Sequence, residues 1–289
     1  MKVKEALSWG TQTLEAEKIS SPRLDSEVLL MYNLNLTRTR LYLDYERELT
    51  NQEEADYRKL ISRRIARVPV AYLTGKKEFM SLELQVDSRV LIPRPETELL
   101  VERVLEEMKE YSSPVRVLDI GTGSGAIALS LAYYSSDGNQ IYALDYSEEA
   151  LQVARTNAGK LGLTERVKFL HGNLWAGMDL ELDNNYFQVI ISNPPYISQG
   201  EMLTLEREVL DYEPHLALVA GSDGLDFYRR ISQGLPDYLA PGGLVALEVG
   251  KGQADLVKEL LENTKIFSKI KVLPDYAGIE RIVMAWREK

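Results

Sequence analysis

The motif most suited to chemistry is Asn193-Pro194-Pro195-Tyr196, which directly follows an apolar run, Phe187 to Ser192, typical of a buried strand. Two successive prolines remove two backbone donors and stiffen the chain, so the Asn193 side-chain oxygen and the Pro194 carbonyl can both face outward as acceptors. Tyr196 adds an aromatic face for stacking. Two acceptors in a stiff turn suit a planar NH2 group, which they would orient toward an electrophile without a strong base. The alternative is an ordinary turn between a strand and a helix.

A second motif is the glycine-rich loop Gly121-Thr122-Gly123-Ser124-Gly125, which separates an apolar run from a helix predicted over Ile127 to Ala132. Glycines let the backbone turn sharply and approach a ligand closely, with helix N–H groups pointing at it. The loop is typical of nucleotide-like cofactor sites. It also fits the dinucleotide fingerprint, so NAD stays open, as does a tight turn without a ligand. A phosphate-binding P-loop is disfavoured because no Gly-Lys-Ser/Thr follows.

Asp145 ends the next predicted strand. A carboxylate at that place can accept hydrogen bonds from both ribose hydroxyls, as in the dinucleotide-binding folds. The alternative is a capping role for a helix that starts near Ser147. Taken together, the glycine loop and Asp145 favour a cofactor of the adenosine type.

The elements that must position these residues alternate between strand and helix after Pro93 and Pro95. Seven strands are predicted, at Val115 to Ile120, Gln140 to Asp145, Val167 to His171, Phe187 to Ser192, Gly243 to Val249, Lys269 to Leu273 and Arg281 to Trp286. Helical patterns separate several of them, among them Glu148 to Gly159 and Gln253 to Leu261, and Glu96 to Tyr111 precedes the first. This order predicts a mostly parallel sheet covered on both faces, with ligands at the carboxyl ends of the strands.

The first part of the chain follows a different pattern and is predicted to be a small all-helical bundle over residues 1–74. Its helix signals are a capping box at Thr50 and Glu53, a helix start at Ser21 and Pro22, and a stop at Pro69. Gly75-Lys76 is a turn candidate, and alternation from Leu82 to Val86 predicts a strand, so residues 75–92 are predicted to form a β-hairpin linker. Residues 93–289 then form the α/β domain.

Composition excludes several classes of protein. The 289 residues include 34 basic and 44 acidic ones, a formal net charge of −10, which disfavours a protein that coats nucleic acid. Cysteine is absent and there are two histidines, so we expect no disulfide, no thiol nucleophile and no metal site. No apolar run is long enough for a membrane span, and Met1 to Gly10 lacks the apolar stretch of a signal peptide. We therefore expect a cytoplasmic protein without a membrane partner.

The residues described so far resemble the S-adenosylmethionine-dependent amino-methyltransferases, and in particular the HemK/PrmC family of protein-(glutamine-N5) methyltransferases that modify class I peptide release factors. The supporting segments keep the order and spacing of the catalytic half of that family, and the arginine-proline-glutamate stretch separates it from nucleic-acid methyltransferases. These segments are Lys77 to Leu82, Leu91 to Glu98, Asp119 to Ala132, Asn193 to Tyr196, Tyr212 to Pro214 and Asp275 to Arg281. The resemblance implies a Rossmann-like seven-stranded methyltransferase domain preceded by a helical substrate-docking domain.

The resemblance also implies roles for individual residues. Gly121 to Gly125 would hold the methionine part of S-adenosylmethionine, with Asp119 reaching its ammonium group or capping the loop, and Asp145 would hold the ribose. Asn193 to Tyr196 would hold the glutamine side chain, and Asn193 would also border the cofactor. His171 to Trp175, which includes Asn173 and Leu174, would flank the adenine, and this chain has Asn173 where the family usually has aspartate. Phe79 and Arg94 are expected near the site.

Other candidates have plainer interpretations. His215 is expected in a surface or capping role, because this reaction needs no imidazole. A solvated helix face is the default interpretation of the basic residues Arg58, Lys59, Arg63, Arg64 and Arg67, with a docking surface as the alternative. The expected partner is a class I release factor, with no direct nucleic-acid binding. Two alternatives stay open: an amino-methyltransferase acting on a nucleic-acid base, which should carry a basic recognition domain, and a non-enzymatic nucleotide-binding module.

Overall fold

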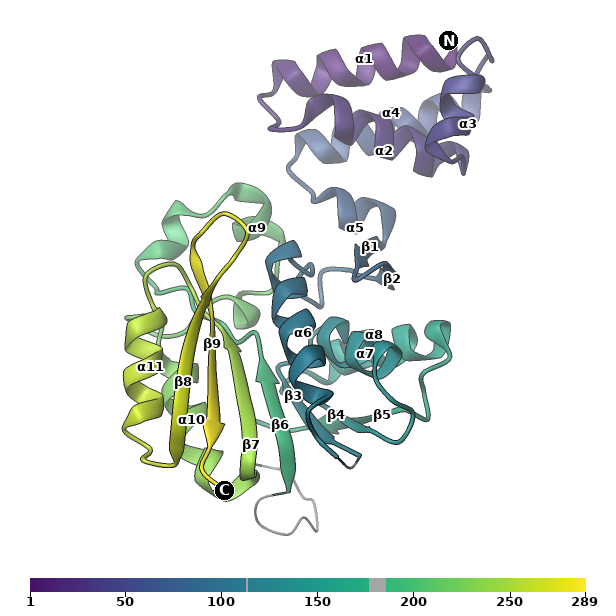
Figure 1. Ribbon diagram of the computed structural model, residues 1–289. Coiled ribbons are helices and arrows are strands. Elements are labelled where there is room, and N and C mark those ends of the chain that lie inside the picture. Colours follow the sequence, from purple (N-terminus) through teal and green to yellow (C-terminus); the bar gives the residue numbers. More distant parts are fainter. Residues whose placement is uncertain (113, 177–185) are drawn as a thin grey trace. The chain divides into compact units, whose positions relative to one another are not determined.

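The computed structural model describes residues 1–112, 114–176 and 186–289 of the chain (Figure 1). The chain divides into two compact units, one formed by Met1–Lys76 with Glu206–Tyr212 and the other by Lys77–Leu205 with Glu213–Lys289. The short segment Glu206–Tyr212 thus belongs to the helical unit, although the chain on both sides of it belongs to the α/β unit. Whether the predicted division at residues 74 and 92 marks independently folding domains stays a prediction.

The first unit is helical. Its helices pack around a buried core that includes Leu14, Leu29, Leu41 and Tyr57. The helices are α1 (Val3–Ala16), α2 (Pro22–Leu34), α3 (Arg38–Leu43), α4 (Asn51–Ile65), α5 (Val70–Thr74) and α9 (Arg207–Tyr212).

The predicted helix signals of this unit have mixed outcomes. The capping box of Thr50 and Glu53 begins α4, and Pro22 begins α2. Pro69 does not end the last helix, because α4 already ends at Ile65 and Pro69 instead precedes the short helix α5.

The expectation of a solvated basic face is wrong for Arg64. This residue is 2% exposed, and its guanidinium donates to Asp25 Oδ2 at 2.7 Å and to Glu208 Oε1 at 2.5 Å. Two carboxylates neutralise the buried cation, which burial alone would disfavour. The pair with Glu208, together with a bond from the Tyr212 hydroxyl to the Ala66 carbonyl at 2.6 Å, explains why α9 belongs to the helical unit.

The second unit is built on a seven-stranded sheet in the order β5-β4-β3-β6-β7-β9-β8. β3 to β7 run parallel, and β9 runs antiparallel to both β7 and β8. The strands are β3 (Arg116–Ile120), β4 (Gln140–Asp145), β5 (Val167–His171), β6 (Phe187–Ser192), β7 (Leu239–Glu248), β8 (Phe267–Pro274) and β9 (Glu280–Arg287). All seven predicted strands are therefore present, and three of them have the predicted bounds.

Helices cover both faces of this sheet (Figure 1). Alternate residues of β3 show the division, since Val117 packs into the core beneath one layer and Leu118 into the core beneath the other. The first layer has α6 (Pro95–Met108), α7 (Ala126–Tyr134) and α8 (Glu148–Leu161), and the second has α10 (Asp226–Tyr238) and α11 (Ala254–Glu262). The predicted Rossmann-like α/β class is confirmed, although α10 was not predicted.

The predicted hairpin is present, Gly75 of the turn candidate is a turn residue, and the turn of the hairpin itself is Met80-Ser81, which was not predicted. β1 (Lys76–Phe79) and β2 (Leu82–Gln85) pair around Met80 and Ser81, which both have positive φ, 49° and 58°. Two central residues with positive φ match the turn that suits the twist of a two-residue hairpin. Lys76 begins a strand, and Gly75, at φ 71°, ends α5. Two short 3-10 helices, Glu201–Thr204 and His215–Ala217, complete the described elements, and no described helix is long and apolar enough to cross a membrane.

Candidate active site

The polar residues singled out by the sequence lie at the carboxyl ends of adjacent strands. Ile120 at the end of β3 is paired with Leu144 of β4 on one side and with Ser192 of β6 on the other. Gly121, Asp145 and Asn193 are the next residues of these three strands. The order of the strands reverses at β3, because β4 and β5 lie on one side and β6 and β7 on the other. Open α/β sheets bind ligands in the crevice at such a reversal.

The glycine loop directly follows β3, and there is open space beside two of its glycines. Gly121 and Gly123 have φ of 75° and 56°, and a Cβ built on either would meet no atom within 4 Å. Gly121 and Thr122 donate to the Leu144 carbonyl, and the buried Ser124 carbonyl accepts from Asn157 at 2.9 Å. Gly125 differs, because its Cβ would lie 2.9 Å from Leu129. The first two glycines thus border open space, whereas Gly125 permits close packing on α7.

Asp145 joins this loop to the start of α8. Its Oδ2 accepts from the Gly123 N–H at 2.8 Å, and its Oδ1 accepts from the Ser147 N–H at 2.9 Å. The cap of α8 is Ser147, whose hydroxyl accepts from the Ala150 N–H, so the predicted capping alternative falls on Ser147 and Asp145 binds the residue that caps the helix. A carboxylate has about four lone-pair sites, so two bonds leave room for ribose hydroxyls. Burial raises the pKa of Asp145, while the backbone N–H groups lower it.

Asp119 is fully buried beneath the loop. Its Oδ2 accepts from the Thr122 hydroxyl at 2.7 Å and from the Ala128 N–H at 3.2 Å, so the predicted alternative of loop capping is present. Its Oδ1 is buried and has no hydrogen-bond partner among the described residues. Burial raises the pKa of Asp119 to about 7.

The segment from His171 to Trp175 follows β5, the neighbour of β4. Asn173 Oδ1 accepts from Arg230 at 2.5 Å, so its amide faces α10 rather than standing free. Leu174 is 7% exposed and has φ 56°. Trp175 donates to the Arg230 carbonyl at 2.7 Å and stacks on Tyr238. The roles of Asn173 and Leu174 at an adenine ring stay a prediction, but the position of Trp175 is set by α10.

The Asn193 side chain is held by two successive hydrogen bonds through Thr97 and Glu248. Its Nδ2 donates to Thr97 Oγ1 at 3.0 Å, and Thr97 Oγ1 donates to Glu248 Oε2 at 2.6 Å. Glu248 is the last residue of β7, and the pairing of Ser192 with Leu247 places Asn193 and Glu248 at neighbouring strand ends. No described residue donates to Asn193 Oδ1, which is not one of the buried unpaired atoms. The free end of the amide is thus an acceptor.

The rest of the tetrapeptide is firmly packed. Pro194 is buried, and Pro195 and Tyr196 are half-buried. The Tyr196 carbonyl accepts from Gln253 at 2.9 Å, and a Cβ at Gly250 would lie 3.1 Å from the Tyr196 ring. Burial raises the pKa of the Tyr196 hydroxyl to about 12, so it stays protonated near neutral pH and is no general base.

Of the two other residues expected near the site, Phe79 lies in the hydrophobic core and Arg94 lies just before α6. Phe79 is 1% exposed and lies in the core beneath α6. Arg94 precedes α6 and donates to Glu213 Oε1 at 2.6 Å, and the buried Glu213 carboxylate also accepts from the Ile92 N–H. This pair fixes the loop that leads into α6.

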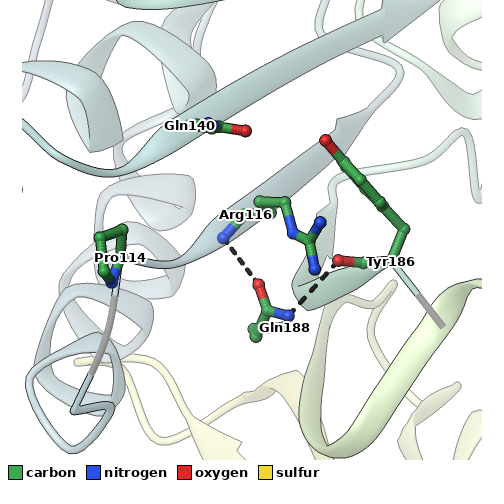
Figure 2. Close-up of a pocket in the computed structure, with 5 residues that line it drawn as sticks. All are labelled: Pro114, Arg116, Gln140, Tyr186 and Gln188. Carbon is green, nitrogen blue, oxygen red and sulfur yellow. Dashed lines mark hydrogen bonds between the residues drawn. The ribbon is translucent and has the colours of Figure 1, made fainter. Parts of the chain in front are cut away.

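A cavity of about 350 Å³ lies at the opposite ends of the strands, their amino ends (Figure 2). Arg116 and Gln140, the first residues of β3 and β4, line it together with Pro114, Tyr186 and Gln188. The Arg116 guanidinium lies 3.7 Å from the centre of the Tyr186 ring, and the Arg116 N–H donates to Gln188 at 2.9 Å. Because the polar motifs lie at the carboxyl ends of the strands, this cavity is not the candidate site.

Three residues close to the site were not predicted as part of it: Thr97, Glu248 and Asn157. Each is at most 4% exposed although its side chain is polar or charged. A carboxylate directly after the apolar run Leu244 to Leu247 is the sequence signal that marks Glu248. Thr97 and Asn157 lie on helices, where nothing local distinguishes them from other polar residues.

Comparison with known proteins gives two family matches. The model described as the PrmC N-terminal domain matches residues 5–75, and a model described as a methyltransferase domain matches residues 112–273. A methyltransferase structure from Pyrococcus furiosus aligns with a TM-score of 0.54 at 20% identity, covering 79% of this chain and 100% of that one, and shares the fold.

Curated relatives match over the full length. A release factor glutamine methyltransferase of Moorella thermoacetica is 44% identical over 290 residues and covers 100% of both chains. A protein of the same name from Clostridium acetobutylicum is 40% identical over 288 residues and covers 99% of both chains. The chain belongs to the release factor glutamine methyltransferase family, whose methyl donor is S-adenosylmethionine.

Proposed function

We propose that this enzyme methylates the side-chain amide nitrogen, N5, of the glutamine in the Gly-Gly-Gln loop of class I peptide chain release factors. The observation that carries the proposal is the Asn193 amide, whose nitrogen is bound to Thr97 and whose oxygen is free beside the glycine loop. An acceptor at that place suits an NH2 donor such as a glutamine amide. Full-length relatives named for the same activity support the proposal.

A glutamine amide nitrogen is a weak nucleophile because its lone pair is delocalised. In the proposed site, Asn193 Oδ1 accepts one N–H of the substrate, Pro194 offers its carbonyl to the second, and Tyr196 packs beside the side chain. Because no residue of the tetrapeptide is a base, these residues contribute by positioning and electrostatics. Glycines beside the substrate glutamine would let its loop enter a narrow site with little steric cost.

The glycine loop and Asp145 fit the cofactor that the family uses. The open space above Gly121 and Gly123 admits a ligand close to the backbone, and the free lone pairs of Asp145 suit the ribose. The unpaired Asp119 Oδ1 is an acceptor beneath the same loop and suits an ammonium group. When bound, S-adenosylmethionine supplies an electrophilic methyl group. Thr122, Ser124, Gly125, Asn173 and Leu174 complete the proposed cofactor set.

Release factors as partners, the cytoplasm as the location and the absence of direct nucleic-acid binding belong to the same proposal. The net charge of −10 disfavours binding to a nucleic-acid backbone. If the helical unit binds a second surface of the release factor, that contact would raise the overall affinity of the enzyme for the factor whose loop enters the site.

The test is mass spectrometry of a purified class I release factor after incubation with the enzyme and isotope-labelled S-adenosylmethionine. We expect one labelled methyl group on the glutamine of the Gly-Gly-Gln peptide, and none on a factor in which that glutamine is replaced by glutamate. Labelling of adenine in DNA with an unmodified release factor would favour the nucleic-acid alternative. Lack of cofactor binding by calorimetry would favour a non-enzymatic module.

A further inference from the structure

Thr97 lies in the first turn of α6, within the stretch Arg94-Pro95-Glu96-Thr97-Glu98, and its side chain is 4% exposed. Its hydroxyl is bonded on one side to Glu248 and on the other to Asn193, at 2.6 and 3.0 Å. The three residues come from α6, the end of β7 and the turn after β6. None of the roles proposed above accounts for this threonine or for the carboxylate behind it.

The hydrogen atoms of this chain can be assigned from the inventory of donors. A hydroxyl has one hydrogen to donate, and an ionised carboxylate can only accept. With Glu248 ionised, Thr97 must therefore donate to Glu248, and only its lone pairs remain for Asn193. Because the Thr97 oxygen can only accept from Asn193, the Asn193 NH2 group must face Thr97. The Asn193 Oδ1 atom then points away from Thr97.

This selection matters because the two ends of a carboxamide have nearly the same shape. A flipped Asn193 would direct its NH2 group toward the NH2 group of the substrate, and two donors cannot bond to each other. The packing of an amide does not distinguish the two orientations, whereas a fixed acceptor at Thr97 does.

We propose that Thr97 and Glu248 are positioning residues that lock the Asn193 carboxamide with Oδ1 toward the substrate amide, so that Glu248 sets the acceptor character of the site through the Thr97 hydroxyl. The inference rests on the proposed function, since it concerns how that site holds an NH2 donor. Neither residue touches the reacting atoms in this account.

The protonation state of Glu248 then controls which groups donate and which accept in the two hydrogen bonds that join Glu248, Thr97 and Asn193. A protonated Glu248 can donate to Thr97, which frees the threonine hydrogen for Asn193 and favours the flipped amide. Burial raises the pKa of Glu248 to about 7, and Thr97 lowers it. The other titratable or charged groups around this carboxylate, from every element packed on it, are Glu96, Arg94, Arg281, Tyr196 and Tyr228. Turnover should therefore fall as Glu248 becomes protonated at lower pH.

The first experiment compares Thr97→Val, which keeps the shape but removes the hydroxyl, with Thr97→Ser, which keeps the hydroxyl. The matched control is Ser130→Ala, because the Ser130 hydroxyl is buried on α7 without a described hydrogen-bond partner. For release-factor methylation we expect Thr97→Val to lower kcat roughly tenfold, with little change in the dissociation constant of S-adenosylmethionine. Thr97→Ser and Ser130→Ala should stay within about twofold of the wild type.

Thr97→Val with wild-type kcat overturns the proposal, as does a loss of kcat that Thr97→Ser does not restore. The second variant is Glu248→Gln, for which we expect a lower kcat with a smaller acid limb, because the new amide does not titrate whereas Asp119 still does. An acid limb identical to that of the wild type would assign it to another group and overturn the role of Glu248.

A measurement without turnover separates this inference from the proposed function. The side-chain NH2 resonance of Asn193, identified by its absence in Asn193→Ala, should shift in Thr97→Val and stay near its wild-type position in Ser130→Ala. If the wild-type enzyme does not methylate a release factor, the proposed function fails, and this resonance still tests the positioning. An Asn193 resonance that is unchanged in Thr97→Val overturns the inference.

Discussion

The two sides of the reversal point in the sheet are built by different means. On the side proposed to bind the cofactor (the cofactor side), Gly121 to Gly125 and Asp145 are held mainly by backbone N–H groups and carbonyls. On the acceptor side, Asn193 is held by the side chain of Thr97, which in turn depends on Glu248. The first arrangement depends on the main-chain conformation at two adjacent strand ends, whereas the second depends on the side chains of three separate elements.

The carboxylates of the two sides show the same difference. Asp145 receives two backbone N–H groups, from Gly123 in the glycine loop and from Ser147; burial raises its pKa, although these N–H groups lower it. Glu248 instead receives a side-chain donor, the Thr97 hydroxyl from α6, and burial raises its pKa to about 7. Variants on each side should therefore separate cofactor binding from turnover.

The largest expected effect is that of Asn193→Ala. Loss of a positioned polar group should lower kcat about 100-fold or more, whereas the affinity for S-adenosylmethionine should fall much less. Single-turnover kinetics and calorimetry measure the two quantities. Asn263→Ala, at the exposed end of α11, is the control. Equal losses in kcat and in cofactor affinity would make Asn193 a cofactor residue and remove the contrast between the two sides.

Asp145→Ala should act on the other side. Hydrogen bonds to a charged group contribute about 1.5–3 kcal/mol, so cofactor affinity should fall by that amount while kcat at saturation changes less. Ser147→Ala is the control, since it removes the bond from the Ala150 N–H to the Ser147 hydroxyl and leaves the Asp145 side chain intact. Calorimetry decides: an equal loss of affinity in Ser147→Ala would mean that Asp145 acts by holding the start of α8 in place rather than by contact with the cofactor.

Gly121→Ala should have a smaller effect on folding than on binding. At φ 75°, an alanine costs about 1–2 kcal/mol of stability, and its Cβ would occupy the open space above the loop. Gly162→Ala has a matched backbone, with φ 71° and no atom within 4 Å, but lies at the end of α8. Urea unfolding should give similar losses for both variants, and only Gly121→Ala should weaken the cofactor. Equal cofactor affinities would contradict ligand approach at Gly121.

The smallest expected effect concerns stability and pH on the acceptor side. The pKa of Glu248 is raised from 4.5 to about 7 in the fold. The raised pKa favours the protonated folded form, so its stabilisation is complete below about pH 4.5 and is lost as the pH rises through 7. The free energy of unfolding of Glu248→Gln, measured with urea, should therefore fall less than that of the wild type between pH 5 and pH 8.

Asp119, whose pKa is also raised to about 7, should leave part of that pH dependence in place in Glu248→Gln. A pH dependence that Glu248→Gln leaves unchanged would contradict the buried, ionisable state of Glu248 on which the acceptor side depends.

Local patterns predicted much of the α/β unit. Apolar runs that end in a polar residue located β4, β5 and β6 with their observed bounds. The same reasoning missed α10. It also missed the hairpin turn at Met80 and Ser81, because neither Met nor Ser is a typical residue for positive φ. Arg64 was expected on a solvated face because its partners, Asp25 and Glu208, lie on other helices.

The sequence by itself determined the parts of the site whose geometry is local. Glycines at positive φ and two prolines in a turn act through their own backbone conformation, so their types are sufficient to predict them. Only the tertiary structure decided that Thr97 and Glu248 meet at Asn193. These residues lie on separate elements, and their hydrogen bonds form only because the register of β6 with β7 and the packing of α6 on the sheet place the three side chains within bonding distance.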